Sequence, residues 1–144
     1  MNRIHSLVRG ALVFIAGFLA VSAIPGGLAL LAGFYAPPVE QLAGSVFRSF
    51  LVPGLTLLLV VGGSALAAAV LLVRRSRLAC ACAGLSGAFV MAFEFVEVLA
   101  IGSPRGPAFV MQVLYFAIGL ALVCLSLLLA SSETVLREEA PARP

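Results

Sequence analysis

The chain alternates long uncharged apolar runs with short polar connections, and four of these runs are long enough to cross a membrane. The hydrocarbon core of a bilayer takes about 20 helical residues. The runs cover residues 10–35, 51–73, 78–101 and 107–130. Helices pair all their backbone groups internally, whereas an open sheet in lipid leaves edge groups unpaired. The pattern therefore predicts an all-α membrane protein, an antiparallel four-transmembrane-helix bundle forming one domain over residues 1–130.

The segments outside these runs carry weaker helical patterns. In the long first loop, apolar residues recur at helical spacing between 39 and 50, which predicts a short interfacial helix on the outer membrane surface. Pro37 and Pro38 end the first helix before it, because proline does not continue a helix. Residues 131–144 form a polar cytoplasmic tail, in which 132–139 can add a last helical turn or two.

Arginine placement predicts the orientation in the membrane, since cytoplasmic loops carry the excess of positive charge. All nine basic residues are arginine. Arg48 and Arg105 fall on one side of the predicted bundle, and the other seven fall on the opposite side: Arg3, Arg9, Arg74, Arg75, Arg77, Arg137 and Arg143. Both termini are therefore expected in the cytoplasm. A composition rich in Ala, Leu, Gly and Arg is typical of GC-rich bacterial genomes, which suggests the bacterial inner membrane.

The first run also resembles a signal peptide, because Val21-Ser22-Ala23 looks like a cleavage site. Apolarity continues through 28–35, beyond a normal signal sequence, which favours a retained first helix.

Composition places the chain in the membrane class. It is 62% hydrophobic and 10% charged, with a mean hydropathy of +1.19, whereas soluble domains carry about 25% charged residues. The net charge of +3 is scattered over the chain, so the expected partner is lipid rather than nucleic acid. Cys80, Cys82 and Cys124 form no CxxC pair and are expected to be small buried thiols; no metal or cofactor is predicted.

Two glutamates, Glu94 and Glu97, interrupt the third apolar run. An ionisable group inside a bilayer costs a few kcal/mol or more, so it usually has a partner or a task. Residues three apart share a helix face. Two carboxylates this close in a low dielectric are not expected to ionise together, unless Arg105 pairs with one of them.

Other polar residues are expected in the same membrane layer. A rise of about 1.5 Å per residue places Glu94 roughly 7 Å and Glu97 roughly 11 Å outward from the helix midpoint. Gln112, Thr56 and Tyr115 come out roughly 10, 9 and 5 Å from theirs. Two interpretations follow. In one, the glutamates exchange a proton or hold a cationic ligand that these neighbours orient. In the other, they hydrogen-bond Gln112 and Arg105 and lock the third and fourth helices together.

Small residues and one proline predict how the helices meet. Pro25, followed by Gly26 and Gly27, should kink the first helix, either for packing or as part of a ligand site. Small residues at four-residue spacing allow close helix approach. The predicted packing rows, one on the second helix and one on the third, are Gly63 with Ala67, and Gly84 with Ala88 and Ala92.

The absence of HExxH, GxSxG and phosphate-loop motifs argues against an enzyme, leaving the glutamate pair as the one route to catalysis. The segments 47–55, 60–63 and 111–116 with Gly119 resemble small four-span bacterial integral membrane proteins, and the topology is loosely similar to DoxX-like proteins. That resemblance implies four spans and assigns no activity. Two functions stay open. The first is a non-enzymatic accessory or scaffold subunit, or a homo-oligomer, acting through helix packing. The alternative is a small oligomeric proton- or cation-coupled transporter or channel that uses Glu94 and Glu97.

Overall fold

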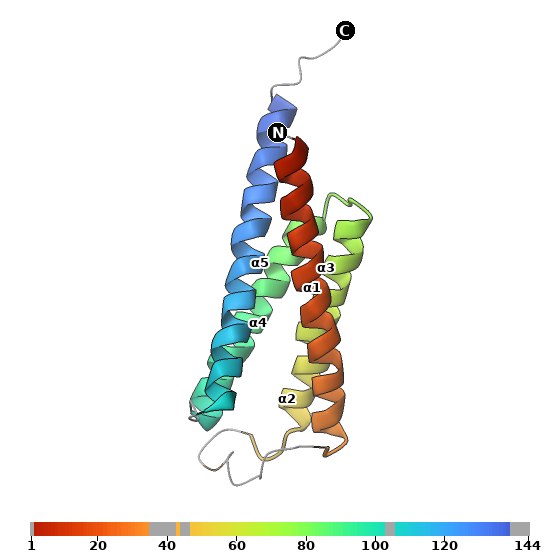
Figure 1. Cartoon of the computed structure of the whole chain (residues 1–144). Helices are drawn as coiled ribbons and strands as arrows, with labels where there is room; N and C mark the ends of the chain where they lie inside the picture. The colour runs from red at the N-terminus through yellow and green to blue at the C-terminus, as the bar shows by residue number, and fades with distance from the viewer. Residues whose placement is uncertain (1, 35–42, 44–46, 103–105, 139–144) are drawn as a thin grey trace.

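The computed structural model describes residues 2–34, 43, 47–102 and 106–138 (Figure 1). These residues form helices and no strands, so the predicted all-helical class is confirmed. The elements are α1 (Asn2–Leu31), α2 (Leu51–Leu55), the π-helical segment η2 (Thr56–Gly62), α3 (Gly63–Val73), α4 (Ala79–Ile101) and α5 (Pro107–Glu138). Four stretches are long and apolar enough to cross a membrane: Arg3–Leu31, Leu51–Val73, Ala79–Ala100 and Pro107–Ser132.

The helix ends differ from the predicted runs at α1 and α5. The first helix begins near the N-terminus at Asn2 and ends at Leu31, because Gly33 adopts a φ of +74° that does not continue a helix. The last helix continues past the apolar run to Glu138. Its first polar residues satisfy their hydroxyls within the helix, because Ser131 Oγ donates to the carbonyl oxygen of Leu128 at 3.1 Å and Ser132 Oγ to that of Leu129 at 2.9 Å.

The second span is continuous, but its outer half contains a π-helical stretch that the sequence pattern did not predict. Residues Thr56–Gly62 form η2 between α2 and α3. π-Helical turns are rare and frequently occur at functional sites. Here the stretch lies against α1. Ile24 of α1 leaves no room for a side chain at Gly62, and the facing residues of η2 and α2 leave none at Gly27.

The predicted interfacial helix over 39–50 falls partly outside the described residues, which exclude 39–42 and 44–46. Its last part is wrong, because residues 47–50 are not helical and 48–50 form bends. Phe47 and Phe50 are half-buried and line a groove between η2 and α4, so burial of their rings takes precedence over the helical spacing.

The helices form two closely associated groups. On one side α1 packs along α2, η2 and α3, and on the other α4 packs along α5 (Figure 1). Contacts of α3 with α4, and of α1 with α5, join the two groups. The start of α1 and the end of α5 lie at one end of the molecule, and the end of α4 and the start of α5 lie at the other (Figure 1). The buried core runs between the groups and consists mainly of Leu, Val and Ala.

The tightest helix contact joins α4 to α5 through two glycines that the predicted packing rows missed. A Cβ built on Gly87 would lie 2.5 Å from the carbonyl oxygen of Gly119, and one built on Gly119 would lie 2.7 Å from the carbonyl oxygen of Gly87. The buried stripe of α4 is Ala83, Gly87, Val90 and Glu94. The glutamate face of α4 is therefore the packing face.

The predicted packing rows are wrong for most of their members. Ala67, Ala88 and Ala92 are exposed, and a Cβ on Gly63 would meet no atom within 4 Å. Gly84 does face α5, where a Cβ would lie 3.0 Å from Ser126 Oγ. In a chain this rich in small residues, several faces of one helix carry the same four-residue spacing. The rotation of α4 about its axis turns the face that includes Gly87 toward α5.

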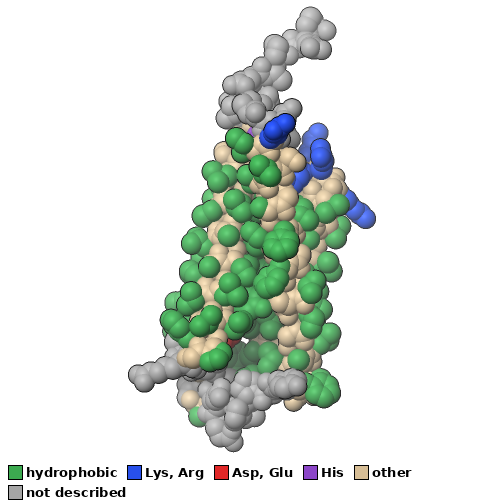
Figure 2. Space-filling view, viewed as in Figure 1, with side chains coloured by type: hydrophobic (Ala, Val, Ile, Leu, Met, Phe, Trp, Pro, Cys, Tyr) green, Lys and Arg blue, Asp and Glu red, His purple; other side chains and the backbone are tan. Residues whose placement is uncertain are grey.

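The surface agrees with a membrane environment. Hydrophobic side chains cover the lateral face, while arginines gather at the end that carries the termini (Figure 2). Many large apolar residues are exposed, among them Phe14, Leu59, Phe95 and Leu127 at 61% or more. Such exposure is unusual for a soluble monomer and ordinary for helices that face lipid tails.

Candidate functional site

A cavity of about 330 Å³ lies within the bundle and is lined by residues of all four membrane-length helices. We call it the carboxyl pocket. Its lining is mainly apolar, and its polar members are Ser22 of α1, Glu94 and Glu97 of α4, and Gln112 and Tyr115 of α5. Figure 2 shows red carboxylate atoms at the bottom of a hollow between the helices.

Glu94 is the most deeply buried charged residue among those described, with 7% of its surface exposed. It lies on the buried stripe of α4, one helical turn beyond Val90. Within the described part of the chain its carboxyl group has no hydrogen-bond partner. A buried carboxyl group without a protein partner is costly, so its environment calls for a proton or a ligand.

Gln112 connects the second carboxylate to the end of α4. Its Nε2 donates to Glu97 Oε1 at 3.2 Å and to the carbonyl oxygen of Gly102 at 3.3 Å. Its Oε1 is buried and has no hydrogen-bond partner. Because only 6% of Gln112 is exposed, this oxygen is an acceptor that water on the protein surface does not satisfy. The amide thus holds Glu97 and leaves an unpaired acceptor at the carboxyl pocket.

The other polar groups of the carboxyl pocket add acceptor character. Ser22 Oγ donates to the carbonyl oxygen of Leu19 at 3.1 Å, which leaves the lone pairs of its oxygen available. Among the described lining residues there is no arginine or histidine. The pocket therefore suits a proton, or a ligand that is cationic or donates hydrogen bonds.

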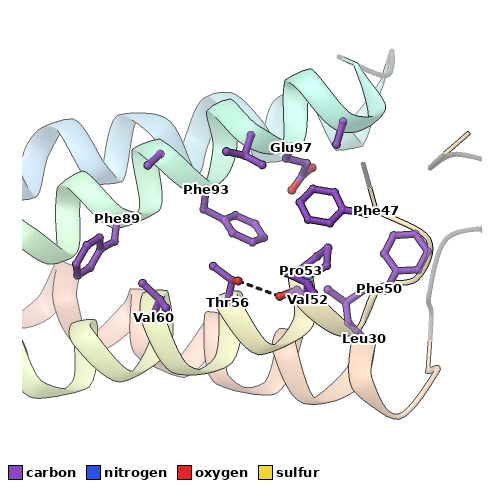
Figure 3. A pocket seen from close by; sticks show the side chains of 13 residues that line it. Leu30, Phe47, Phe50, Val52, Pro53, Thr56, Val60, Phe89, Phe93 and Glu97 are labelled. Carbon is purple, nitrogen blue, oxygen red and sulfur yellow. Dashed lines mark hydrogen bonds between the residues drawn. The ribbon is translucent and has the colours of Figure 1, made fainter. Parts of the chain in front are cut away.

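A second cavity, of about 400 Å³, lies between η2 and α4 (Figure 3). We call it the lateral groove. It is lined largely by apolar and aromatic side chains, and Phe47, Phe89 and Phe93 point into it (Figure 3). Phe93 and Glu97 also line the carboxyl pocket, so these two residues lie between the two cavities.

The structure brings together four of the six predicted site residues. Glu94, Glu97, Gln112 and Tyr115 all line the carboxyl pocket. Thr56 does not, because it faces the lateral groove and its hydroxyl donates to the carbonyl oxygen of Val52 at 2.9 Å (Figure 3). The sixth, Arg105, lies outside the described residues.

The three residues of the predicted kink region, Pro25, Gly26 and Gly27, differ in their surroundings. Helix α1 continues through Pro25 without interruption. Gly26 lines the carboxyl pocket, whereas Gly27 is a packing position, since a Cβ there would lie 2.7 Å from Leu58 Cβ. One glycine thus opens space for the cavity, and the next allows close approach of η2.

Sequence reasoning missed Ser22 and Phe93. Ser22 is the sole side-chain hydroxyl between Arg9 and Phe34, a signal that could have marked it. Phe93 offered no signal, because a phenylalanine in an apolar helix is ordinary. The expectation of buried thiols is wrong for Cys124, which is exposed, while Cys80 and Cys82 are half-buried.

Comparison with known proteins adds no assignment. No family model, curated protein or solved structure matches this chain. Among the described residues, no group of three or more His, Cys, Asp or Glu side chains is placed to hold a metal ion.

Proposed function

We propose that this protein is a small membrane carrier that exchanges a proton for a cationic ligand at the carboxyl pocket. One observation carries the proposal. Gln112 Oε1 is a buried acceptor without a hydrogen-bond partner, Glu94 is 7% exposed and makes no hydrogen bond to another described residue, and both residues line one cavity shared by all four membrane-length helices. Partnerless buried acceptors destabilise a fold, so their presence around a cavity favours binding over structure.

The scaffold hypothesis accounts for only part of this arrangement. It expects the carboxylates to be used in bonds between helices, as Glu97 is with Gln112. Glu94 makes no such bond within the described chain.

The proposed setting is the bacterial inner membrane, with the helices antiparallel and both termini in the cytoplasm. The gathering of arginines at the end that carries the termini supports this orientation (Figure 2). In this orientation the carboxyl pocket lies in the outer half of the membrane, and the connection between α4 and α5 lies outside.

Proton exchange can be measured in liposomes that hold the purified protein and a trapped pH indicator. Addition of an organic ammonium salt, tested as tetramethylammonium and as octyltrimethylammonium, should drive proton movement absent from empty liposomes. Glu94→Gln keeps the shape of the side chain but cannot exchange a proton, so we expect the rate to fall about tenfold or more. Glu97→Gln should also slow it.

Ser64→Ala is the matched control, since the Ser64 hydroxyl donates to the carbonyl oxygen of Val61 in its own membrane span and lines neither cavity. It should retain the wild-type rate. A wild-type rate no higher than that of empty liposomes with both salts, or a Glu94→Gln rate equal to wild type, would refute the carrier and return the scaffold hypothesis to first place.

A further inference from the structure

We infer that the carboxyl pocket takes its ligand sideways from the bilayer through the lateral groove, and that this ligand is an amphiphilic cation with an ammonium head and an apolar tail. The inference rests on the proposed function and specifies the ligand class and its route.

The lateral groove opens onto surface that faces lipid. Its exposed lining residues are apolar, among them Val52, Val60, Phe89, Ala92 and Val96. A cavity with such a mouth offers no polar group to a small hydrated ion. It accepts a molecule that is already dissolved among lipid tails.

The lateral groove also has a polar end and an apolar end. Phe89 lies near the midpoint of α4, and Glu97 lies about 12 Å farther along the helix by its rise per residue. Figure 3 shows the Glu97 carboxylate beside Phe47 at one end, with Phe89 and Val60 at the other. An amphiphile in the outer leaflet has the same polarity, with its head near the interface and its tail toward the membrane centre.

Charge complementarity selects a cationic head. Glu97 is the sole ionisable residue among the described lining of the lateral groove. Phe47 and Phe93 stand beside it, and the faces of aromatic rings attract ammonium groups within about 6 Å. The Glu97 carboxylate would repel an anionic lipid head, and an uncharged alkyl tail alone would make no charge contact with it.

Phe93 is the aromatic one of the two residues that lie between the lateral groove and the carboxyl pocket. It lines both cavities together with Glu97, and its half-buried ring projects from α4 into the lateral groove (Figure 3). Rotation of this one side chain would open a passage from the head-binding end of the groove to Glu94. Phe93 is thus assigned as a gate and not as a catalytic residue.

The test compares two cations with one head group, tetramethylammonium and octyltrimethylammonium, on the protein in lipid nanodiscs, with empty nanodiscs subtracted. Calorimetry should show octyltrimethylammonium binding about tenfold or more tighter, because burial of its tail adds to the shared charge contact. Glu97→Gln should remove most of this binding. Octanol, which has the tail without the charge, should bind weakly and equally to both forms.

The gate is tested by the rate of proton release on mixing with octyltrimethylammonium. Phe93→Trp enlarges the ring and should slow release about tenfold, whereas Phe93→Ala should not slow it. Phe95→Trp is the matched control, because Phe95 lies on the same helix and is 61% exposed to the lipid side.

The outcomes separate the two proposals. Equal affinity for both cations, or equal rates for Phe93→Trp and Phe95→Trp, would overturn the lateral route while leaving the proton exchange intact. Octanol binding as tight as that of octyltrimethylammonium would show that the lateral groove merely holds lipid chains, and would overturn the ligand class. Absence of binding by either cation would overturn both proposals.

Discussion

Gly87→Ala should lower the free energy of unfolding by on the order of 1–3 kcal/mol, the usual cost of forcing an extra methyl group into a packed contact. The added Cβ would lie 2.5 Å from the Gly119 carbonyl oxygen, an atom of rigid backbone that no side-chain rotation can move. Helices α4 and α5 would have to separate along the contact that brings them closest. Unfolding of the purified protein by sodium dodecyl sulfate, followed by circular dichroism, measures the change.

Gly63→Ala is the matched control, because it makes the same substitution inside a helix where a Cβ meets no atom within 4 Å. It should be neutral or slightly stabilising, as alanine favours helix over glycine. Gly119→Ala should resemble Gly87→Ala, and the double variant should cost less than the sum, since both changes break one contact. Equal stability of Gly87→Ala and Gly63→Ala would contradict the close approach of α4 and α5.

The sequence predicted the four membrane-length stretches, and the extent of the second and third, because membrane crossing is a matter of length and polarity. The second and third predicted runs match Leu51–Val73 and Ala79–Ile101 within a residue. The packing rows failed for a different reason. Small residues permit a close contact but do not select it, so Ala88 and Ala92 looked as suitable as Gly87, and only the arrangement of the neighbouring helices decides between them.

The members of the carboxyl pocket were predictable where the depth of a residue in the membrane is enough to bring it near the others. Glu94, Glu97, Gln112 and Tyr115 fall in one layer by helical rise, and all four line the carboxyl pocket. Thr56 shares that layer but faces the lateral groove, because depth says nothing of rotation about the helix axis. The π-helical turn of η2 adds to the difficulty, since it shifts the facing of residues 56–62 from that of a regular α-helix.

Glu94→Leu should raise the free energy of unfolding by roughly 1–3 kcal/mol, the range found for buried polar groups that lack partners. Leucine has a similar size and meets the apolar neighbours of the carboxyl pocket without a desolvation cost. Glu97→Leu is the comparison on the same helix face. Its free energy of unfolding should rise by less than that of Glu94→Leu, or fall. It removes the acceptor at 3.2 Å from Gln112 Nε2 and leaves that amide with Gly102 alone.

This pair of variants decides between carrier and scaffold without any knowledge of the ligand. When a residue is kept for function at the expense of stability, its replacement makes the protein more stable. When a residue holds helices together, its replacement makes the protein less stable. A more stable Glu94→Leu protein that no longer exchanges protons would place Glu94 in the first group. A clear loss of stability would place it in the second, and would mean that Glu94 supports the bundle through contacts of its own.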